Sequence, residues 1–215
     1  MSKSKNQHTR SYDWKKEQHR SIVPPLYLGS VHGFISADEG AAIFSGKEEG
    51  YAYTRLGNPT VAAFEAWLAD AEGGAKTFAT GSGLSALLLA VFALTKKRKH
   101  IVTSPYIYGG SYHLVHLLRQ RGVHITVVKN ALKLSSWKRT VTNETAFVLI
   151  ETPSNPSVDL FDIAAIAEIV HKKGAMLIVD STIATPALQK PLQYGADAVL
   201  HSVTKYLIRQ SSGLG

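Results

Sequence analysis

The stretch AFVLIETPSNPSVDLFDIAAIAEIVHKKGAMLIVDST, residues 146–182, decides the fold class of this chain. Its first eight residues are an apolar run of strand length, and residues 175–182 form a second such run. Between the two runs, residues 162–174 carry apolar side chains at helical spacing and end in glycine, which predicts a helix. Two apolar strands separated by a helix are typical of a parallel sheet.

The same alternation of strands and helices extends over most of the chain. Further strands are expected at 76–83, 100–105, 123–129 and 196–205, and further helices at 60–73, 85–95 and 111–122. The helix at 85–95 is almost wholly apolar, which predicts that it is buried. Strands that read as continuous apolar runs are covered on both faces. We therefore expect an α/β fold, with a mostly parallel sheet sandwiched by helices.

Composition narrows the class of protein. The chain has 215 residues, 45% of them hydrophobic and 19% charged, which is typical of a globular protein with one large domain or one domain and an appendage. The absence of cysteine excludes a disulfide framework and a zinc–cysteine site. No apolar run has the length of a membrane span, and no signal-peptide hydrophobic region follows the start. These features favour a cytoplasmic enzyme without a membrane partner.

The formal net charge of +8 raises the alternative of a nucleic-acid surface. Basic residues gather within residues 1–20 and in KKRK, residues 96–99. Neither cluster has interleaved aromatic residues or a recognition-helix pattern. KKRK follows an apolar helix, and cations complement the C-terminus of a helix. We therefore expect these charges to be solvated, with no nucleic-acid partner.

Residues that carry chemistry follow the predicted strands. In open parallel sheets, ligands bind outside the carboxyl ends of the strands. The residues found at those ends are Gly81, Ser82, Gly83, Tyr106, Tyr108, Glu151, Thr152, Asn155, Asp180, Ser202, Thr204 and Lys205. Together they offer an anion-binding helix start, an aromatic ring, an amide, a carboxylate and an amine. This set suits a flat, phosphorylated, nitrogen-containing aromatic cofactor bound covalently to an amine, and pyridoxal 5′-phosphate (PLP) has these properties.

Each member of this set also has a structural interpretation. Lys205 is alternatively a surface lysine at a strand end, Asp180 a turn or helix-cap residue, and Tyr108 a ring packed beside Gly109 and Gly110. Their occurrence together, in strand order, favours the cofactor site. By contrast, His113 and His116 form an H-x-x-H pair without a third ligand, so we expect a structural role and no metal.

Six motifs carry a resemblance to a known family. They are YAYTRLGNPT (51–60), GSGLSA (81–86), YIYGGSY (106–112), ETPSNP (151–156), VDSTIATP (179–186) and HSVTKY (201–206). From about residue 23 onward the chain resembles the Cys/Met-metabolism PLP-dependent enzymes, a group that includes cystathionine γ-synthase, cystathionine lyases, methionine γ-lyase and O-acetylhomoserine sulfhydrylase. The resemblance implies the large domain of a type I aminotransferase-like PLP enzyme. It also implies a homo-oligomer, usually a tetramer built from dimers.

The resemblance further implies roles for individual residues. Lys205 would hold the cofactor covalently, and Tyr108 would stack on its ring and move protons. Asn155 would bond the 3-oxygen of the ring, and Asp180 the ring nitrogen. The phosphate would be held by Ser202, Thr204 and the backbone N–H groups of Gly83 and Leu84, with Thr182 among the cofactor-binding residues. Tyr53 and Arg55 would reach the phosphate of a neighbouring subunit, so that active sites are shared.

The reaction that the resemblance implies is γ-elimination or γ-replacement on a sulfur amino acid or a homoserine ester, as in trans-sulfuration. O-acetylhomoserine sulfhydrylase or methionine γ-lyase activity is the alternative within the family. Gly110 stands where methionine γ-lyases often carry cysteine, which disfavours that activity. An alternative of another class is a catalytically incomplete fragment that acts only by association with a partner chain.

The chain departs from the family pattern near its end. After the lysine the family commonly continues with a small residue and then Gly-His-Ser-Asp, whereas this chain has Ile208, Arg209, Gln210, Ser211 and Ser212. Family members continue with a C-terminal domain whose arginine binds the substrate carboxylate, and no residue here takes that role. We expect an N-terminal arm at 1–55 and a PLP-binding domain at 56–215, truncated after the cofactor lysine and lacking the C-terminal domain. Such a chain alone is expected to hold PLP weakly or not at all and to turn over poorly.

Overall fold

The computed structural model describes residues 18–208, and the chain divides into two compact units, residues 1–79 and 80–215. Several residues named from the sequence lie outside the described range: most of the basic residues of the first twenty, and Arg209, Gln210, Ser211 and Ser212. The predicted boundary between an arm and a cofactor domain after residue 55 concerns the functional division of the chain, and it stays a prediction.

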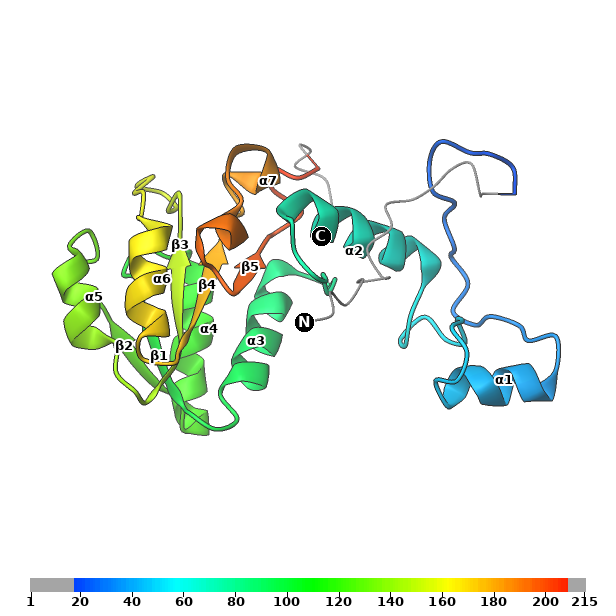
Figure 1. Ribbon diagram of the computed structural model, residues 1–215, viewed down its shortest axis with the longest axis horizontal. Helices are drawn as coiled ribbons and strands as arrows, with labels where there is room; N and C mark the ends of the chain where they lie inside the picture. Colours follow the sequence, from blue (N-terminus) through cyan, green and yellow to red (C-terminus); the bar gives the residue numbers. More distant parts are fainter. Residues whose placement is uncertain (1–17, 209–215) are drawn as a thin grey trace, which may run out of the picture. The chain divides into compact units, whose positions relative to one another are not determined.

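The second unit is built on a five-stranded sheet. Its strands are β1 (His100–Thr103), β2 (His124–Val127), β3 (Thr145–Glu151), β4 (Met176–Asp180) and β5 (Ala198–Leu200). The spatial order is β2-β1-β3-β4-β5, and every neighbouring pair is parallel (Figure 1). The prediction of a mostly parallel sheet is confirmed. The order reverses between β1 and β3, because the chain goes from β1 to β2 on one side and then returns to β3 on the other.

Helices cover both faces of this sheet. They are α3 (Gly83–Leu94), α4 (Gly109–Leu117) with its 3-10 extension η1 (Leu118–Arg121), α5 (Leu134–Thr140), α6 (Ile163–His171), α7 (Thr185–Leu188) and the 3-10 turn η2 (Pro191–Tyr194). One core cluster joins the sheet to Trp137 of α5 and Ile166 of α6, and the other joins it to Leu87 of α3 and Val115 of α4. The sandwiched α/β fold is therefore confirmed.

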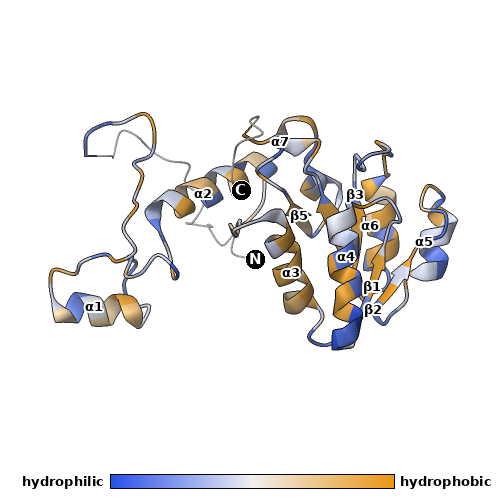
Figure 2. Cartoon of the chain, turned by 180° about the vertical axis from the view of Figure 1, so that it is seen from behind, coloured by the Kyte–Doolittle hydropathy of each residue, from blue (hydrophilic) through white to orange (hydrophobic). Residues whose placement is uncertain are grey.

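The apolar helix predicted at 85–95 forms as α3, but it is buried on one side only. Leu87 and Val91 are almost fully buried, whereas Leu89 is 56% exposed and Phe92 is 51% exposed. Figure 2 shows hydrophobic residues along the whole of this helix. A helix that lies on a sheet buries one face, so the apolar residues on its other faces need a further layer to be covered.

The strand predicted within 76–83 is wrong. Residues 75–80 have no regular secondary structure, and the Ala79 N–H donates to the Glu65 carboxylate at 2.7 Å rather than to a neighbouring strand. An apolar run becomes a strand only where a partner strand accepts its backbone hydrogen bonds. The glycine turn that follows, however, opens α3 as expected.

The helices α5 and α7 and the helix α1 of the first unit were not expected from the sequence. Their lengths of 7, 4 and 8 residues are too short to give a clear helical period in the sequence. The strand predicted at 196–205 is also shorter than expected, because β5 ends at Leu200. The residues after it, including Ser202 and Lys205, form a turn in which the Lys205 N–H donates to the Ser202 carbonyl at 3.1 Å.

The first unit contains α1 (Ala37–Phe44) and α2 (Pro59–Glu72). Helix α2 confirms the prediction at 60–73: Asn58 caps its start, and Gly73, in the left-handed conformation with φ 70°, ends it. The Asn58 side chain also donates to the Tyr27 carbonyl at 3.0 Å, which ties the preceding extended segment to the helix start. Within residues 18–208, no helix has the length and apolar character needed to cross a membrane.

Candidate active site

Nine of the eleven residues predicted for the site line one cavity of about 470 Å³ in the second unit. They are Gly83, Leu84, Tyr108, Asn155, Asp180, Thr182, Ser202, Thr204 and Lys205. These residues come from five separate stretches of the chain, and they meet because each lies at the end of a strand, follows a strand or opens a helix at the carboxyl edge of the sheet. A more open hollow of about 480 Å³ beside α6 and α7 contains none of the predicted residues.

The start of α3 provides the anion-binding end of the cavity. Ser82 caps this helix, with its Oγ accepting the Ser85 N–H at 3.2 Å. A Cβ at Gly83 would lie 3.1 Å from Ser202 Cβ and 3.2 Å from Ser202 Cα, so glycine allows the helix start to approach the turn after β5. The positive end of the helix dipole and the nearby hydroxyls of Ser202 and Thr204 suit a phosphate.

The turn after β5 is connected to β4. The Ser202 N–H donates to Thr182 Oγ1 at 2.8 Å, and the Thr182 N–H donates to Asp180 Oδ1 at 3.0 Å. This chain of contacts ties the turn that carries Ser202 and Lys205 to the acid at the end of β4, and all three residues line the same cavity. Lys205 itself lines the cavity with an exposed side chain, so its amine is open to a ligand.

Asp180 is the last residue of β4 and lies at the acidic end of the cavity. Burial raises the pKa of this carboxyl, against the opposing effects of the Thr182 hydrogen bonds and of His201. A carboxylate in such surroundings gains most from a cationic partner. The protonated nitrogen of a pyridine ring is such a partner, which agrees with the role that the resemblance implies.

Glu151, the last residue of β3, lies next to Asp180 in the register of the sheet. Its side chain is buried at 4% exposure, and its Oε2 accepts the Tyr108 N–H at 2.6 Å while its Oε1 accepts the Asn155 N–H at 2.8 Å. Burial raises the pKa of Glu151 to about 7, and the neighbouring Asp180 adds to the shift, whereas the two backbone hydrogen bonds oppose it. From the sequence, Glu151 was only one of the residues at the strand ends, without a role.

Tyr108 occupies the N-cap position of α4. From the sequence its ring was considered either as part of the cofactor site or as packed beside the glycines, and its position is compatible with both. It lines the cavity, and it also packs on the glycines that follow it: a Cβ at Gly110 would lie 2.5 Å from Tyr108 Cε1. The ring is 49% exposed, so one face is available to a planar ligand. Glycine at position 110 therefore helps to decide where the ring lies.

Tyr53 and Arg55 belong to the first unit and lie beside one another, with Arg55 Cζ 4.8 Å from the centroid of the Tyr53 ring. The tyrosine is 37% exposed. Their role at the phosphate of a neighbouring subunit stays a prediction.

The H-x-x-H pair of α4 gains no further ligand from the fold. In the described part of the chain, no group of three or more His, Cys, Asp or Glu side chains is placed to hold a metal ion. His116 instead packs on Tyr112, with 4.0 Å between the ring centroids, and burial lowers its pKa.

A parallel α/β sheet with a helix start, an acid and a lysine around one cavity at its carboxyl edge defines the class of the fold-type I PLP-dependent enzymes. The sequence profile of the family described as Cys/Met metabolism PLP-dependent enzyme matches residues 6–215. The chain belongs to this family, and the resemblance seen in the six motifs is confirmed.

Its relatives are enzymes of sulfur amino-acid metabolism. The chain is 40% identical over 191 residues to an O-succinylhomoserine sulfhydrylase of Pseudomonas aeruginosa, a match that covers 88% of this chain and 47% of the relative. It is 40% identical over 195 residues to an L-methionine gamma-lyase of Treponema denticola, covering 89% of this chain and 48% of the relative. The chain thus spans about half the length of the curated relatives it matches.

Solved structures agree with this assignment. A Campylobacter jejuni protein assigned as an O-acetylhomoserine (thiol)-lyase superposes with a TM-score of 0.88 at 32% identity, over 96% of this chain and 51% of that one. That protein carries a pyridoxyl-lysine phosphate. Cystathionine gamma-lyase of Lactobacillus plantarum, complexed with L-serine, superposes with a TM-score of 0.82 at 33% identity, over 97% and 51% of the two chains.

Proposed function

We propose that this chain binds PLP covalently through Lys205 and serves γ-elimination or γ-replacement on a sulfur amino acid or a homoserine ester. The observation that supports it is the convergence of Lys205, Asp180 and the start of α3 on one cavity. An amine, an acid and an anion-binding helix start match the aldehyde, the ring nitrogen and the phosphate of one cofactor.

In this proposal each residue has a physical task. Bound PLP supplies an electron sink that stabilises negative charge on the substrate carbon attached to the amine. Asp180 keeps the ring nitrogen protonated, and Asn155 bonds the 3-oxygen. Lys205 would hold the cofactor through its amine, and Lys205 Nζ, when not so engaged, would accept the proton of that carbon. Tyr108 covers one face of the ring and keeps water away from it.

The subgroup is proposed from Gly110. A side chain at this position would meet the Tyr108 ring, so this chain keeps the ring where a cysteine-containing site would displace it. This favours cystathionine-type or homoserine-ester chemistry over methionine γ-lyase activity. The relatives that are 40% identical include both an O-succinylhomoserine sulfhydrylase and a methionine gamma-lyase, so the choice rests on Gly110.

The proposal includes a cytoplasmic homo-oligomer, with Tyr53 and Arg55 completing the phosphate site of a neighbouring subunit and with no nucleic-acid partner. A guanidinium grips phosphate oxygens at two points, which suits Arg55 to that role. The alternative, a catalytically incomplete chain that acts by association with a partner, predicts cofactor binding or turnover only in the presence of that partner.

The test is to trap the cofactor. The purified chain is mixed with excess PLP, its absorption is recorded, and the mixture is reduced with borohydride and mapped by peptide mass spectrometry. We expect a band near about 420 nm that vanishes on reduction, and a pyridoxyl group on the peptide that contains Lys205. Lys205→Ala should lose both signals, and the exposed control Lys133→Ala should keep them.

Two outcomes contradict the proposal: free-PLP absorbance alone in the wild-type chain, or a pyridoxyl group that persists in Lys205→Ala on another lysine. With the cofactor trapped, product analysis on a homoserine ester with a thiol, on cystathionine and on methionine separates the subgroups. Methionine as the preferred substrate would contradict the choice made from Gly110.

A further inference from the structure

The reversal of strand order between β1 and β3 makes a crevice at the carboxyl edge of the sheet. Ligands of parallel sheets bind at such a reversal, because the two chain segments leave in opposite directions. Here the segment after β1 carries Tyr108, and the segment after β3 carries Asn155. Whatever holds these two segments together sets the spacing between the aromatic ring and the amide.

Glu151 makes that connection. Each of its carboxylate oxygens accepts one backbone N–H, from Tyr108 at 2.6 Å and from Asn155 at 2.8 Å. The side chain is only 4% exposed, so water has little access to replace these bonds. Both oxygens point at backbone donors, which leaves to Asp180, on the next strand, the role of partner to a ligand nitrogen.

Glu151 also completes the start of α4. Tyr108 is the N-cap residue of this nine-residue helix, and no side chain of the helix caps it. A carboxylate at a helix N-terminus satisfies a free N–H and interacts favourably with the helix dipole. Here that carboxylate comes from a neighbouring strand, so the position of α4, and of the tyrosine at its start, depends on β3.

The two segments differ in how much else holds them. The loop that carries Asn155 has internal bonds of its own: Ser154 and Asp159 are linked by an N–H to carbonyl bond of 3.1 Å and an N–H to hydroxyl bond of 2.9 Å. Apart from the bond to Glu151, the segment before α4 is held by fewer bonds, from the Tyr106 N–H to Ser104 Oγ at 2.9 Å and from the Ser104 N–H to the Leu149 carbonyl at 3.2 Å. Loss of the carboxylate bonds should therefore loosen the tyrosine segment more than the asparagine loop.

We propose that Glu151 is a positioning residue for the cofactor ring, one that fixes Tyr108 relative to Asn155 across the crevice and does not itself touch the reacting atoms. The proposal deepens the proposed function and rests on it, since the ring in question is that of PLP. It predicts that a change at Glu151 alters the orientation of the bound ring more than it alters the stability of the fold.

The test uses Glu151→Gln, which keeps the shape and one oxygen but turns an NH2 group toward one of the two N–H donors. Glu144→Gln, at an exposed position, is the matched control. In the cofactor-free chain, hydrogen exchange followed by mass spectrometry should be about tenfold faster over residues 104–110, the factor expected for one lost hydrogen bond to a charged acceptor. Exchange in α6 should not change.

The second measurement follows the cofactor itself. The circular dichroism of the covalently bound PLP, divided by its absorbance, should fall at least about twofold in Glu151→Gln, because ring orientation relative to Tyr108 sets this ratio. Gly110→Ala, which pushes on the Tyr108 ring and leaves Glu151 intact, should lower the same ratio. Thermal unfolding checks that each variant is folded, and Glu151→Asp replaces Glu151→Gln if the latter does not fold, because its shorter chain cannot reach both donors.

The outcomes separate the two proposals. Unchanged exchange over residues 104–110 in the variant would overturn the inference, whether or not the chain binds PLP. Faster exchange with an unchanged dichroism ratio would reduce Glu151 to a structural tie and would also overturn it. Absence of any borohydride-trapped cofactor in the wild-type chain is instead the failure of the proposed function, recognised before the variants are compared.

Discussion

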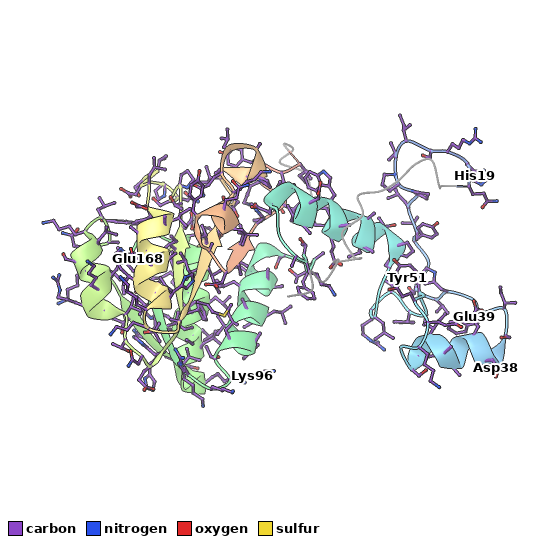
Figure 3. All side chains as sticks on the ribbon, in the orientation of Figure 1. His19, Asp38, Glu39, Tyr51, Lys96 and Glu168 are labelled. Carbon is purple, nitrogen blue, oxygen red and sulfur yellow. The ribbon has the colours of Figure 1, made fainter. Side chains whose placement is uncertain are left out.

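The two edges of the same sheet differ in how their charged side chains are surrounded. At the amino edge, Arg98 Nη1 lies 2.8–3.3 Å from the carbonyl oxygens of Thr145, Lys173 and Gly174, which ties the connection between α3 and β1 to the start of β3 and to the turn between α6 and β4. The lysines around it are exposed, as Figure 3 shows for Lys96. At the carboxyl edge, two acids, Glu151 and Asp180, are neighbours in register, and both have a raised pKa.

This difference separates stability from function. The amino edge places its cations either on backbone carbonyls or in water, where they cost little free energy. The carboxyl edge keeps two acids side by side in partly dry surroundings, which destabilises the cofactor-free fold. Perturbed acids in a cavity are typical of functional sites, and a cationic ligand nitrogen would relieve the cost.

Among the substitutions at the two edges, Asp180→Asn is expected to have the largest effect. The amide keeps the oxygen that accepts the Thr182 N–H but loses the charge that pairs with the ring nitrogen, so PLP affinity should fall about a hundredfold. The unfolding free energy of the cofactor-free chain should rise, because a carboxyl with a raised pKa is removed. PLP titration and urea unfolding near pH 8 measure the two, with the exposed Asp70→Asn as control. Unchanged affinity would remove Asp180 from the site.

At the other edge, Arg98→Ala should act on stability alone. Loss of the guanidinium leaves the carbonyl oxygens of Thr145, Lys173 and Gly174 without this donor, and we expect the unfolding free energy to fall by about 1–3 kcal/mol. PLP binding by the folded variant should stay as in the wild type. The neighbouring exposed Lys97→Ala should change stability by less than about 0.5 kcal/mol. Equal effects of the two substitutions in urea unfolding would show that the bonds of Arg98 do not contribute.

The last expected effect concerns the pH dependence of stability at the carboxyl edge. The pKa of Glu151 is about 7 in the folded chain against an ordinary value of 4.5, so the folded state binds a proton that the unfolded state releases between these pH values. The contribution of Glu151 to the unfolding free energy of the cofactor-free chain is therefore fully present below pH 4.5 and is lost as pH rises through 7. The loss is about 2 kcal/mol once screening in the cavity is allowed for.

Urea unfolding between about pH 5 and pH 8 measures this fall, and Glu151→Gln should show a shallower one. The variant should retain part of the dependence, because the pKa of Asp180 is raised in the same direction. Identical slopes in the two proteins would mean that Glu151 is already ionised in the folded chain at low pH.

Much of the fold followed from local pattern. The strands β1 to β4 are apolar runs between turn residues, and α2 has an apolar period with a glycine stop, so each was predictable from neighbouring residues. Helices α1, α5 and α7 were missed because they are short, and two further errors share another cause. Residues 76–80 have the composition of a strand but no partner, and α3 has the composition of a buried helix but a cover on one side only. A neighbouring strand and a covering layer are properties of the assembled fold, and a local sequence pattern does not specify them.

The alternation of strands and helices, the order of the polar residues at the strand ends and the motifs that mark the family are all contained in the sequence. The position of β1 beside β3 is a property of the folded chain, and it brings the Glu151 carboxylate to the Tyr108 N–H 43 residues away. Strand composition reports burial, which is a property of each segment, whereas strand order depends on how the connections cross the sheet. A contact between two strand ends therefore appears only when that order is known.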